Sequence, residues 1–226
     1  MNKIGHLFGS VLLLLALNLC GKDNILKIGE RKTNEVIVTL YLGEMSGKLG
    51  CYFTLERFHA DNHVSLINAI NVLGIVEDKK VTDIRSLISK LRRDLQGCVV
   101  TQSKTNPKII HIIETPLTKL KDYVMQQKVT ITYSGYLGPG RGDGLVLELS
   151  KKLDTIGPRT QGDNTMMFDD ALTKVVVRAK NEKVRDILTN YVSLTNYSPF
   201  IWTAETAKVD GKSKTIVQYF GPRRPQ

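Results

Sequence analysis

Three histidines are the residues best suited to metal chemistry. His59 and His63 lie four residues apart with Asp61 between them, so on a helix both imidazoles would face one side and could hold a zinc ion. A zinc site needs three or four ligands, and His111 could join this pair only through tertiary folding. The same stretch also reads as a solvated turn. Two alternatives stay open: a metal-dependent hydrolase that uses His59, His63 and His111, and a chain with no metal site.

A glycine-rich loop, 138–144, could bind an anion. The backbone N–H groups of such a loop, followed by a helix, can cradle a phosphate. The glycine spacing matches neither the dinucleotide fingerprint nor the P-loop, so we interpret the segment as a connector. It contains the tripeptide Arg141-Gly142-Asp143 of integrin-binding adhesins, which makes Arg141 and Asp143 candidate binding residues.

Aromatic residues are concentrated near the C-terminus, around Phe200 and Trp202. These two residues alternate along a predicted strand, so we expect both side chains on the same face of the sheet. If that face is exposed, it forms a stacking surface for a sugar or a peptide. If it is buried, it belongs to the hydrophobic core, which is the interpretation we favour.

The N-terminus has the features of a secretory signal sequence. Lys3 precedes an apolar run, 7–19, which has the length of a signal h-region. We therefore predict a signal peptide over residues 1–21 and export to the periplasm, the cell envelope or the exterior. The alternative is an uncleaved membrane anchor over residues 4–21.

Cys20 affects both membrane attachment and cysteine chemistry. It lies where a bacterial lipoprotein signal places its acylated cysteine, although Leu19 is larger than the small residue preferred there. Lipid tethering through Cys20 and release by cleavage nearby both stay open. In either case the mature chain keeps Cys51 and Cys98, which form a disulfide in an oxidising compartment or stay as two buried thiols.

The chain is basic, with a formal net charge of +10. Removal of the leader takes away only Lys3 and leaves 31 basic against 22 acidic residues. For an exported protein, an anionic membrane surface or an acidic envelope polymer is a better-placed partner than nucleic acid. Because the basic residues are spread along the sequence, we attribute the charge mainly to solubility.

Hydrophobic periodicity predicts an N-terminal α+β domain over residues 36–120, after a polar tether over 22–35. Its best element is a helix over 81–95, where apolar residues recur at helical spacing. Thr82 or Asp83 can cap the start of this helix. The remaining elements are two hairpins of β-branched and aromatic strands, 36–42 with 51–58 and 98–101 with 109–113.

A second α+β domain is predicted over residues 128–220, followed by a basic tail, 221–226. Its expected elements are strands at 129–133 and 174–178, helices over 145–153 and from Val184, and a C-terminal hairpin that turns at Asp210-Gly211. Together the two domains indicate an α+β fold with small antiparallel or mixed sheets, helices packed on one side and βαβ-type units.

The order of elements over 128–220 resembles the short N-terminal periplasmic modules (STN-like modules) of secretins and TonB-dependent receptors. The segment that carries this resemblance best is 174–181, which leads into the helix at Val184. The resemblance implies a docking or ligand-contact role in the envelope and assigns no functional residue.

We therefore predict an exported, non-enzymatic envelope protein without a cofactor. It would act as a binding or docking module for another protein or for a cell-envelope polymer. The alternative is the secreted metal-dependent hydrolase described above.

Overall fold

The computed structural model describes residues 38–59, 81–95, 97–137, 143–158, 173–190 and 200–219. The predicted signal peptide, tether and tail lie outside these residues, as do Cys20, His63 and Arg141. Within the described ranges, no helix is long and apolar enough to cross a membrane.

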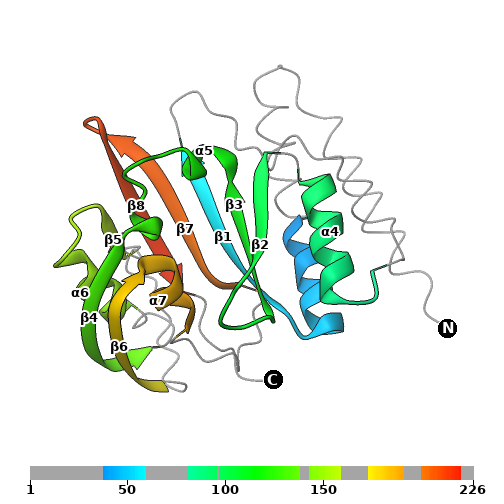
Figure 1. Ribbon diagram of the computed structural model, residues 1–226, viewed down its shortest axis with the longest axis horizontal. Helices are drawn as coiled ribbons and strands as arrows, with labels where there is room; N and C mark the ends of the chain where they lie inside the picture. Colours follow the sequence, from blue (N-terminus) through cyan, green and yellow to red (C-terminus); the bar gives the residue numbers. More distant parts are fainter. Residues whose placement is uncertain are drawn as a thin grey trace, which may run out of the picture.

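A mixed six-stranded sheet with the order β2-β3-β1-β7-β8-β5 forms the centre of the described part of the chain (Figure 1). Its strands are β1 (Tyr52–His59), β2 (Cys98–Gln102), β3 (Ile109–Glu114), β5 (Ile156–Pro158), β7 (Phe200–Val209) and β8 (Lys212–Tyr219). β1 runs parallel to both β3 and β7, whereas the β2–β3 and β7–β8 pairs are antiparallel. The predicted α+β class is confirmed.

The two segments predicted as separate domains share this sheet. β1 and β3 come from the segment 36–120, whereas β7 and β8 come from the segment 128–220. β1 pairs with β3 on one side and with β7 on the other, so its hydrogen bonds join the two segments at the centre of the sheet. Both segments therefore contribute to a continuous structure.

Helices cover both faces of the large sheet, whereas the sequence pattern predicts them on one side only (Figure 1). On one face lie the helical residues 38–49 and α4 (Ile84–Asp94). On the other lie α6 (Asp143–Ser150), α7 (Val184–Asn190) and a two-stranded antiparallel ribbon of β4 (Lys128–Leu137) and β6 (Thr173–Lys183). Two short turns, α5 (Thr115–Thr118) and η2 (Val124–Gln126), connect β3 to β4.

The strand sequences explain why both faces are covered. In β1, Phe53 and Leu55 belong to the core on the α4 side, whereas Phe58 belongs to the core on the α7 side. In β3, Ile110 and Ile112 likewise alternate with residues that face the other core. A strand that is apolar on both faces needs a covering layer on each.

The helix predicted over 81–95 is confirmed as α4. Leu87, Ile88 and Leu91 form its buried stripe. The Asp83 side chain accepts a hydrogen bond from the Ser86 backbone N–H (2.7 Å), and the Ser86 hydroxyl accepts one from the Asp83 N–H (3.2 Å). This reciprocal cap satisfies two N–H groups that the first turn of a helix leaves without partners.

The strand predicted over 36–42 is wrong, because residues 38–49 are helical. Val38, Tyr41, Leu42 and Met45 fall at i, i+3, i+4 and i+7, and all four are buried against the sheet. This spacing forms one apolar stripe on a helix. The strand prediction relied on the β-branched and aromatic residues of this segment, which favour strands. Burial of the apolar stripe stabilises the helix in spite of that preference. β1 therefore has β3 and β7 as partners in place of the predicted hairpin.

The other predicted elements are confirmed, with bounds that differ by a few residues. β2 and β3 form the predicted hairpin, and β4, β6, α6 and α7 lie where strands and helices were expected. β7 and β8 meet at a tight turn in which Asp210 has φ 51° and Gly211 has φ 75°. Positive φ at both central residues is typical of a type I′ hairpin turn.

Candidate functional site

A buried carboxylate lies at the centre of the large sheet. Glu56, on β1, is fully buried on the face that α7 covers. Its side chain accepts hydrogen bonds from the Tyr123 hydroxyl (2.6 Å) and from the Nε and Nη2 atoms of Arg185, the latter at 2.7 Å. Arg185 lies in the first turn of α7, so this two-pronged contact fixes α7 on the sheet.

The charges of this network are mutually satisfied. Burial opposes the charge of Arg185, but the hydrogen bond and the negative charge of Glu56 raise the pKa of Arg185 above its ordinary value. Burial, together with the charge of Glu56, raises the pKa of Tyr123 well above its ordinary value. Tyr123 is therefore a neutral donor to an intact ion pair at physiological pH. The three side chains turn toward one another, which is an arrangement suited to holding the fold together.

His111 is a further buried polar residue on the face of the sheet that carries Glu56. It lies on β3 beside Thr54 of β1, and its Nδ1 is 2.8 Å from the Thr54 hydroxyl oxygen. Burial, and to a smaller extent the positive charge of Arg185, lowers the pKa of His111 from 6.5 to about 4. His111 is therefore neutral at pH 7 and acts as a buried hydrogen-bonding residue.

The buried His111 makes stability depend on pH. Because the unfolded chain binds a proton on this imidazole near pH 6.5 and the folded chain only near pH 4, stability is complete above pH 7 and falls as the pH drops through this window. We expect the free energy of unfolding from urea titrations to fall by about 2 kcal/mol between pH 7 and pH 5. His111→Gln is expected to flatten this dependence, and an equally steep fall in the variant would contradict the assignment.

The predicted histidine site does not form from the two histidines that the structure describes. His59 lies at the exposed end of β1, where its Nε2 is 3.7 Å from a carboxylate oxygen of Glu205. His111 pairs in register with Thr54, five residues before His59, which corresponds to roughly 17 Å along a strand. Among the described residues there is also no group of three or more His, Cys, Asp or Glu side chains that could hold a metal ion.

The prediction that Phe200 and Trp202 share one face is wrong. Phe53 pairs with Phe200, but the next residue, Thr54, pairs with Trp202, so Ile201 is an extra residue in β7. Such a bulge reverses the alternation of side chains. Phe200 packs in the core on the α4 side and Trp202 in the core on the α7 side. Because both are buried, they form no stacking surface, and the core interpretation holds.

The cysteine pair is present as two free thiols, Cys51 and Cys98. Burial raises the pKa of Cys51 to about 11, and its thiol donates a weak hydrogen bond to the backbone oxygen of Met45 (3.8 Å). Burial and the negative charge of Glu114 raise the pKa of Cys98 to about 12. Both thiols are therefore protonated at neutral pH and poorly reactive.

The glycine loop is described only at its end. Residues 138–142 lie outside the described ranges, so the loop stays a prediction, and the helix expected after it begins at Asp143. The candidate binding residues Arg141 and Asp143 therefore stay predictions.

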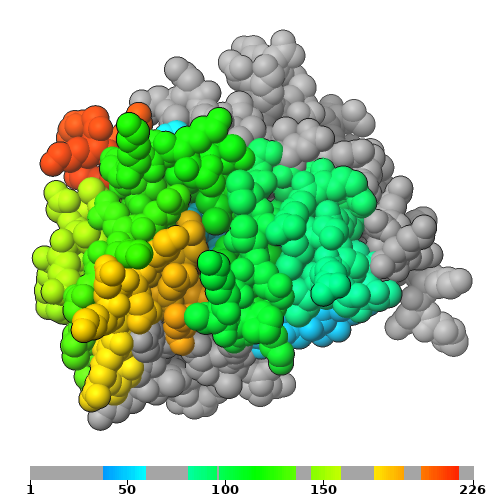
Figure 2. Space-filling model, viewed as in Figure 1, coloured from blue at the N-terminus to red at the C-terminus, as the bar shows by residue number. Residues whose placement is uncertain are grey.

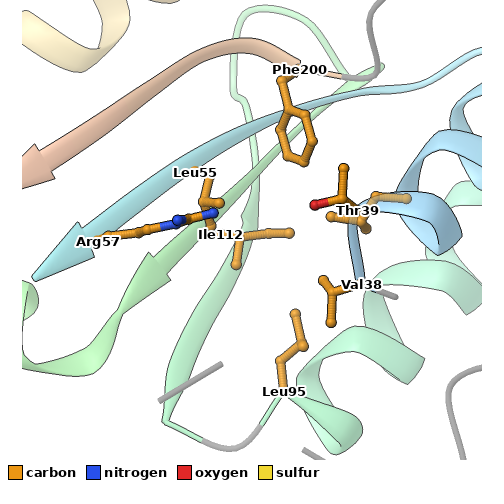
Figure 3. Close-up of a pocket in the computed structure, with 8 residues that line it drawn as sticks. Val38, Thr39, Leu55, Arg57, Leu95, Ile112 and Phe200 are labelled. Carbon is orange, nitrogen blue, oxygen red and sulfur yellow. The ribbon is translucent and has the colours of Figure 1, made fainter. Parts of the chain in front are cut away.

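A small pocket lies between residues 38–49 and the large sheet (Figure 3). Its cavity volume is about 10 Å³, roughly the space that one water molecule needs and far below that of a small-molecule site. Its walls are Val38, Thr39, Leu42, Leu55, Arg57, Leu95, Ile112 and Phe200. Arg57 supplies the charge in this lining, and the remaining side chains are apolar except for Thr39. We therefore interpret the pocket as a gap in the packing and not as a ligand site.

The solvent-facing side of the β4–β6 ribbon carries a cluster of positive charges. The inward residues of the ribbon pack in the core, and the alternate residues are exposed. We call these exposed positions the basic outer face: Lys128, Thr130, Thr132 and Ser134 on β4, with Val176, Arg178, Lys180 and Lys183 on β6. Among these described positions there are four cations and no carboxylate. Figure 2 shows the yellow-to-orange atoms of β6 and α7 at the molecular surface.

Strand register concentrates these cations. Lys128 lies directly opposite Lys183, and like charges in such a position destabilise a ribbon. Asn181, with φ 56°, lies in an irregular part of the pairing, where its N–H donates to the Thr130 hydroxyl (3.1 Å). The irregularity sets Lys180 and Lys183 on the same exposed side of β6. An anion bound here would relieve the repulsion between the cations.

Sequence reasoning missed the basic outer face. Its residues come from two strands about 50 positions apart in the chain, and only one of its cations, Lys128, lies on β4. The signal that could have found them is the alternation of apolar and charged residues over 177–180, which is typical of a strand with one solvent-exposed face.

Comparison with protein-family models, with curated proteins and with solved structures found no match to this chain. The geometry of the described residues is therefore the basis for a functional assignment.

Proposed function

We propose that this chain is an exported docking module of the cell envelope, which acts by binding another envelope component and not by catalysis. The single observation that carries the proposal is the basic outer face, where Arg178, Lys180 and Lys183 of β6 lie beside Lys128 of β4. The neighbouring carboxylate on β6, Glu182, is half-buried and pairs in register with the inward-facing Val129. Clustered cations on a rigid ribbon attract and orient an anionic partner.

Two features of the sequence support the same proposal. The leader over 1–21 directs the chain out of the cytosol, where the abundant anionic surfaces belong to the envelope. The resemblance of 128–220 to STN-like periplasmic modules implies a docking role. In contrast, the buried Glu56 binds Arg185 and Tyr123, which gives it a structural role.

The proposal is tested by sedimentation of the purified protein with isolated bacterial cell envelopes. The full chain is expressed with its leader, and its intact mass reports whether the leader has been removed and Cys20 acylated. We expect the bound fraction at low salt to fall at least tenfold when Lys128, Arg178, Lys180 and Lys183 are all replaced by serine. Protease treatment of the envelopes separates a protein partner from a polymer.

A matched control variant removes four positive charges elsewhere. Lys151 and Lys152 follow α6, and Lys212 and Lys214 lie on β8, and all four are exposed. Their replacement by serine gives the same net charge, so we expect it to leave binding nearly unchanged. Equal binding by the two variants, or recovery of the protein from the cytosol with Met1 attached, would contradict the proposal.

A further inference from the structure

We propose that the partner of the basic outer face is a linear phosphodiester polymer that lies along the β4–β6 ribbon. This inference rests on the proposed function and adds the chemical class of the partner and its direction on the surface.

The cations are arranged as a line along the strands. On a strand, exposed residues two positions apart are separated by roughly 7 Å. Arg178 and Lys180 have this separation on β6, and Lys183 with its neighbour Lys128 continues the line beyond the irregular pairing. A flexible chain with a negative charge in every repeat can place successive anions beside successive cations, whereas a single small anion can contact only one or two.

Hydroxyl groups on the neighbouring strand complement these cations. Thr132 lies directly opposite Arg178, and Ser134 lies opposite Val176. Paired residues on adjacent strands have Cβ atoms about 5 Å apart, so a hydroxyl and a guanidinium can flank one bound anion. A phosphodiester has two non-bridging oxygens and a full negative charge, and can accept one hydrogen bond from each strand.

The composition of the surface distinguishes a polymer from a membrane. Proteins that lie on a bilayer combine basic residues with apolar side chains that enter the acyl boundary. On the basic outer face the exposed apolar residue is Val176, and its neighbours are cations and small hydroxyl residues. The surface is therefore better suited to a water-soluble chain than to the interior of a bilayer.

The test uses the full chain and a fluorescently labelled, delipidated poly(glycerol phosphate) of about a dozen repeats as the probe. The anisotropy of the probe is followed as protein is added at 50 mM salt. We expect the serine variant of Lys128, Arg178, Lys180 and Lys183 to bind at least 30-fold more weakly than the parent chain. Four phosphate contacts also predict that the parent loses affinity by about 50-fold between 50 and 200 mM salt.

The control is the serine variant of Lys151, Lys152, Lys212 and Lys214, whose net charge is identical. It is expected to bind the probe within threefold of the parent. Its ion pairs, Lys151 with Glu148 and Lys212 with Asp154, are exposed, so their loss has little effect on folding. Far-ultraviolet circular dichroism of both variants is expected to match the parent, because every substituted side chain is exposed.

Three outcomes would overturn the inference. Equal loss in both variants would mean that net charge, not the basic outer face, sets binding. Tighter binding to anionic phospholipid vesicles than to the probe would identify a membrane as the partner. If the parent does not bind the probe but still sediments with envelopes, this inference fails while the proposed function stands.

Discussion

Replacement of Arg185 by alanine is expected to lower the free energy of unfolding by about 3–5 kcal/mol, because it leaves the buried Glu56 carboxylate without its cation. The carboxylate would keep only the Tyr123 hydroxyl among the three donors that the structure shows. Chemical denaturation at pH 7, followed by circular dichroism, measures the change. The expected loss is much larger than that of an exposed ion pair such as Lys151 with Glu148, which contributes at most about 1 kcal/mol.

A double variant distinguishes the effect on stability of removing the whole Glu56–Arg185 ion pair from the effect of removing only one of its partners. Glu56→Met combined with Arg185→Met removes both charges and keeps much of the side-chain volume. Since paired buried charges can be replaced by apolar residues at little cost, we expect the double variant to recover most of the stability that Arg185→Ala loses. A loss below 1 kcal/mol in the single variant would show that Glu56 is hydrated in solution, contrary to its burial here.

Replacement of Trp202 by alanine is expected to lower the free energy of unfolding by about 3–5 kcal/mol, as for other large buried aromatic residues. Trp202 is fully buried in the core between the large sheet and α7. Its indole N–H has no hydrogen-bond partner among the described residues. Trp202→Phe therefore loses ring volume without breaking a described hydrogen bond, and we expect a smaller cost. Urea denaturation followed by circular dichroism measures both variants.

The control for this prediction is Leu147→Ala on α6, whose side chain is 48% exposed. We expect it to change stability by less than about 0.5 kcal/mol. If Trp202→Ala were equally mild, Trp202 would not be part of the core, and a stacking surface near the C-terminus would again be a reasonable interpretation.

Helices and strands were predictable where the spacing of apolar residues matched only one type of secondary structure. α4 combines an unbroken apolar stripe with a capping residue, Asp83, and both are visible in the sequence. Residues 38–49 carry two conflicting signals, because the helical stripe begins with Val38 and Tyr41, two residues with high strand preference. The conflict is resolved only by tertiary packing, since the stripe is buried against Phe53 and Leu55 of the sheet.

Long-range pairing was not predictable from local pattern. No local pattern indicates that β1 lies between β3 and β7, because both partners are far from β1 and from each other in the chain. The bulge at Ile201 was unpredictable for the same reason. It is defined by the pairing of β7 with β1, and it sends Phe200 and Trp202 to opposite cores.

The candidate sites depend on the same long-range contacts. Glu56 and Arg185 are 129 residues apart in the chain, so their ion pair has no local signature. The basic residues looked evenly spread along the sequence, and this suggested solubility alone. The pairing of β4 with β6 brings four of them to one face, which changes the physical meaning of the net charge.

The most direct test of the basic outer face as the binding surface is lysine footprinting. Each lysine is acetylated in the free protein and in the presence of poly(glycerol phosphate), and mass spectrometry then gives its rate of modification. We expect Lys128, Lys180 and Lys183 to become protected, whereas Lys151, Lys152, Lys212 and Lys214 react at unchanged rates. Protection spread equally over both groups, or confined to the second, would contradict it.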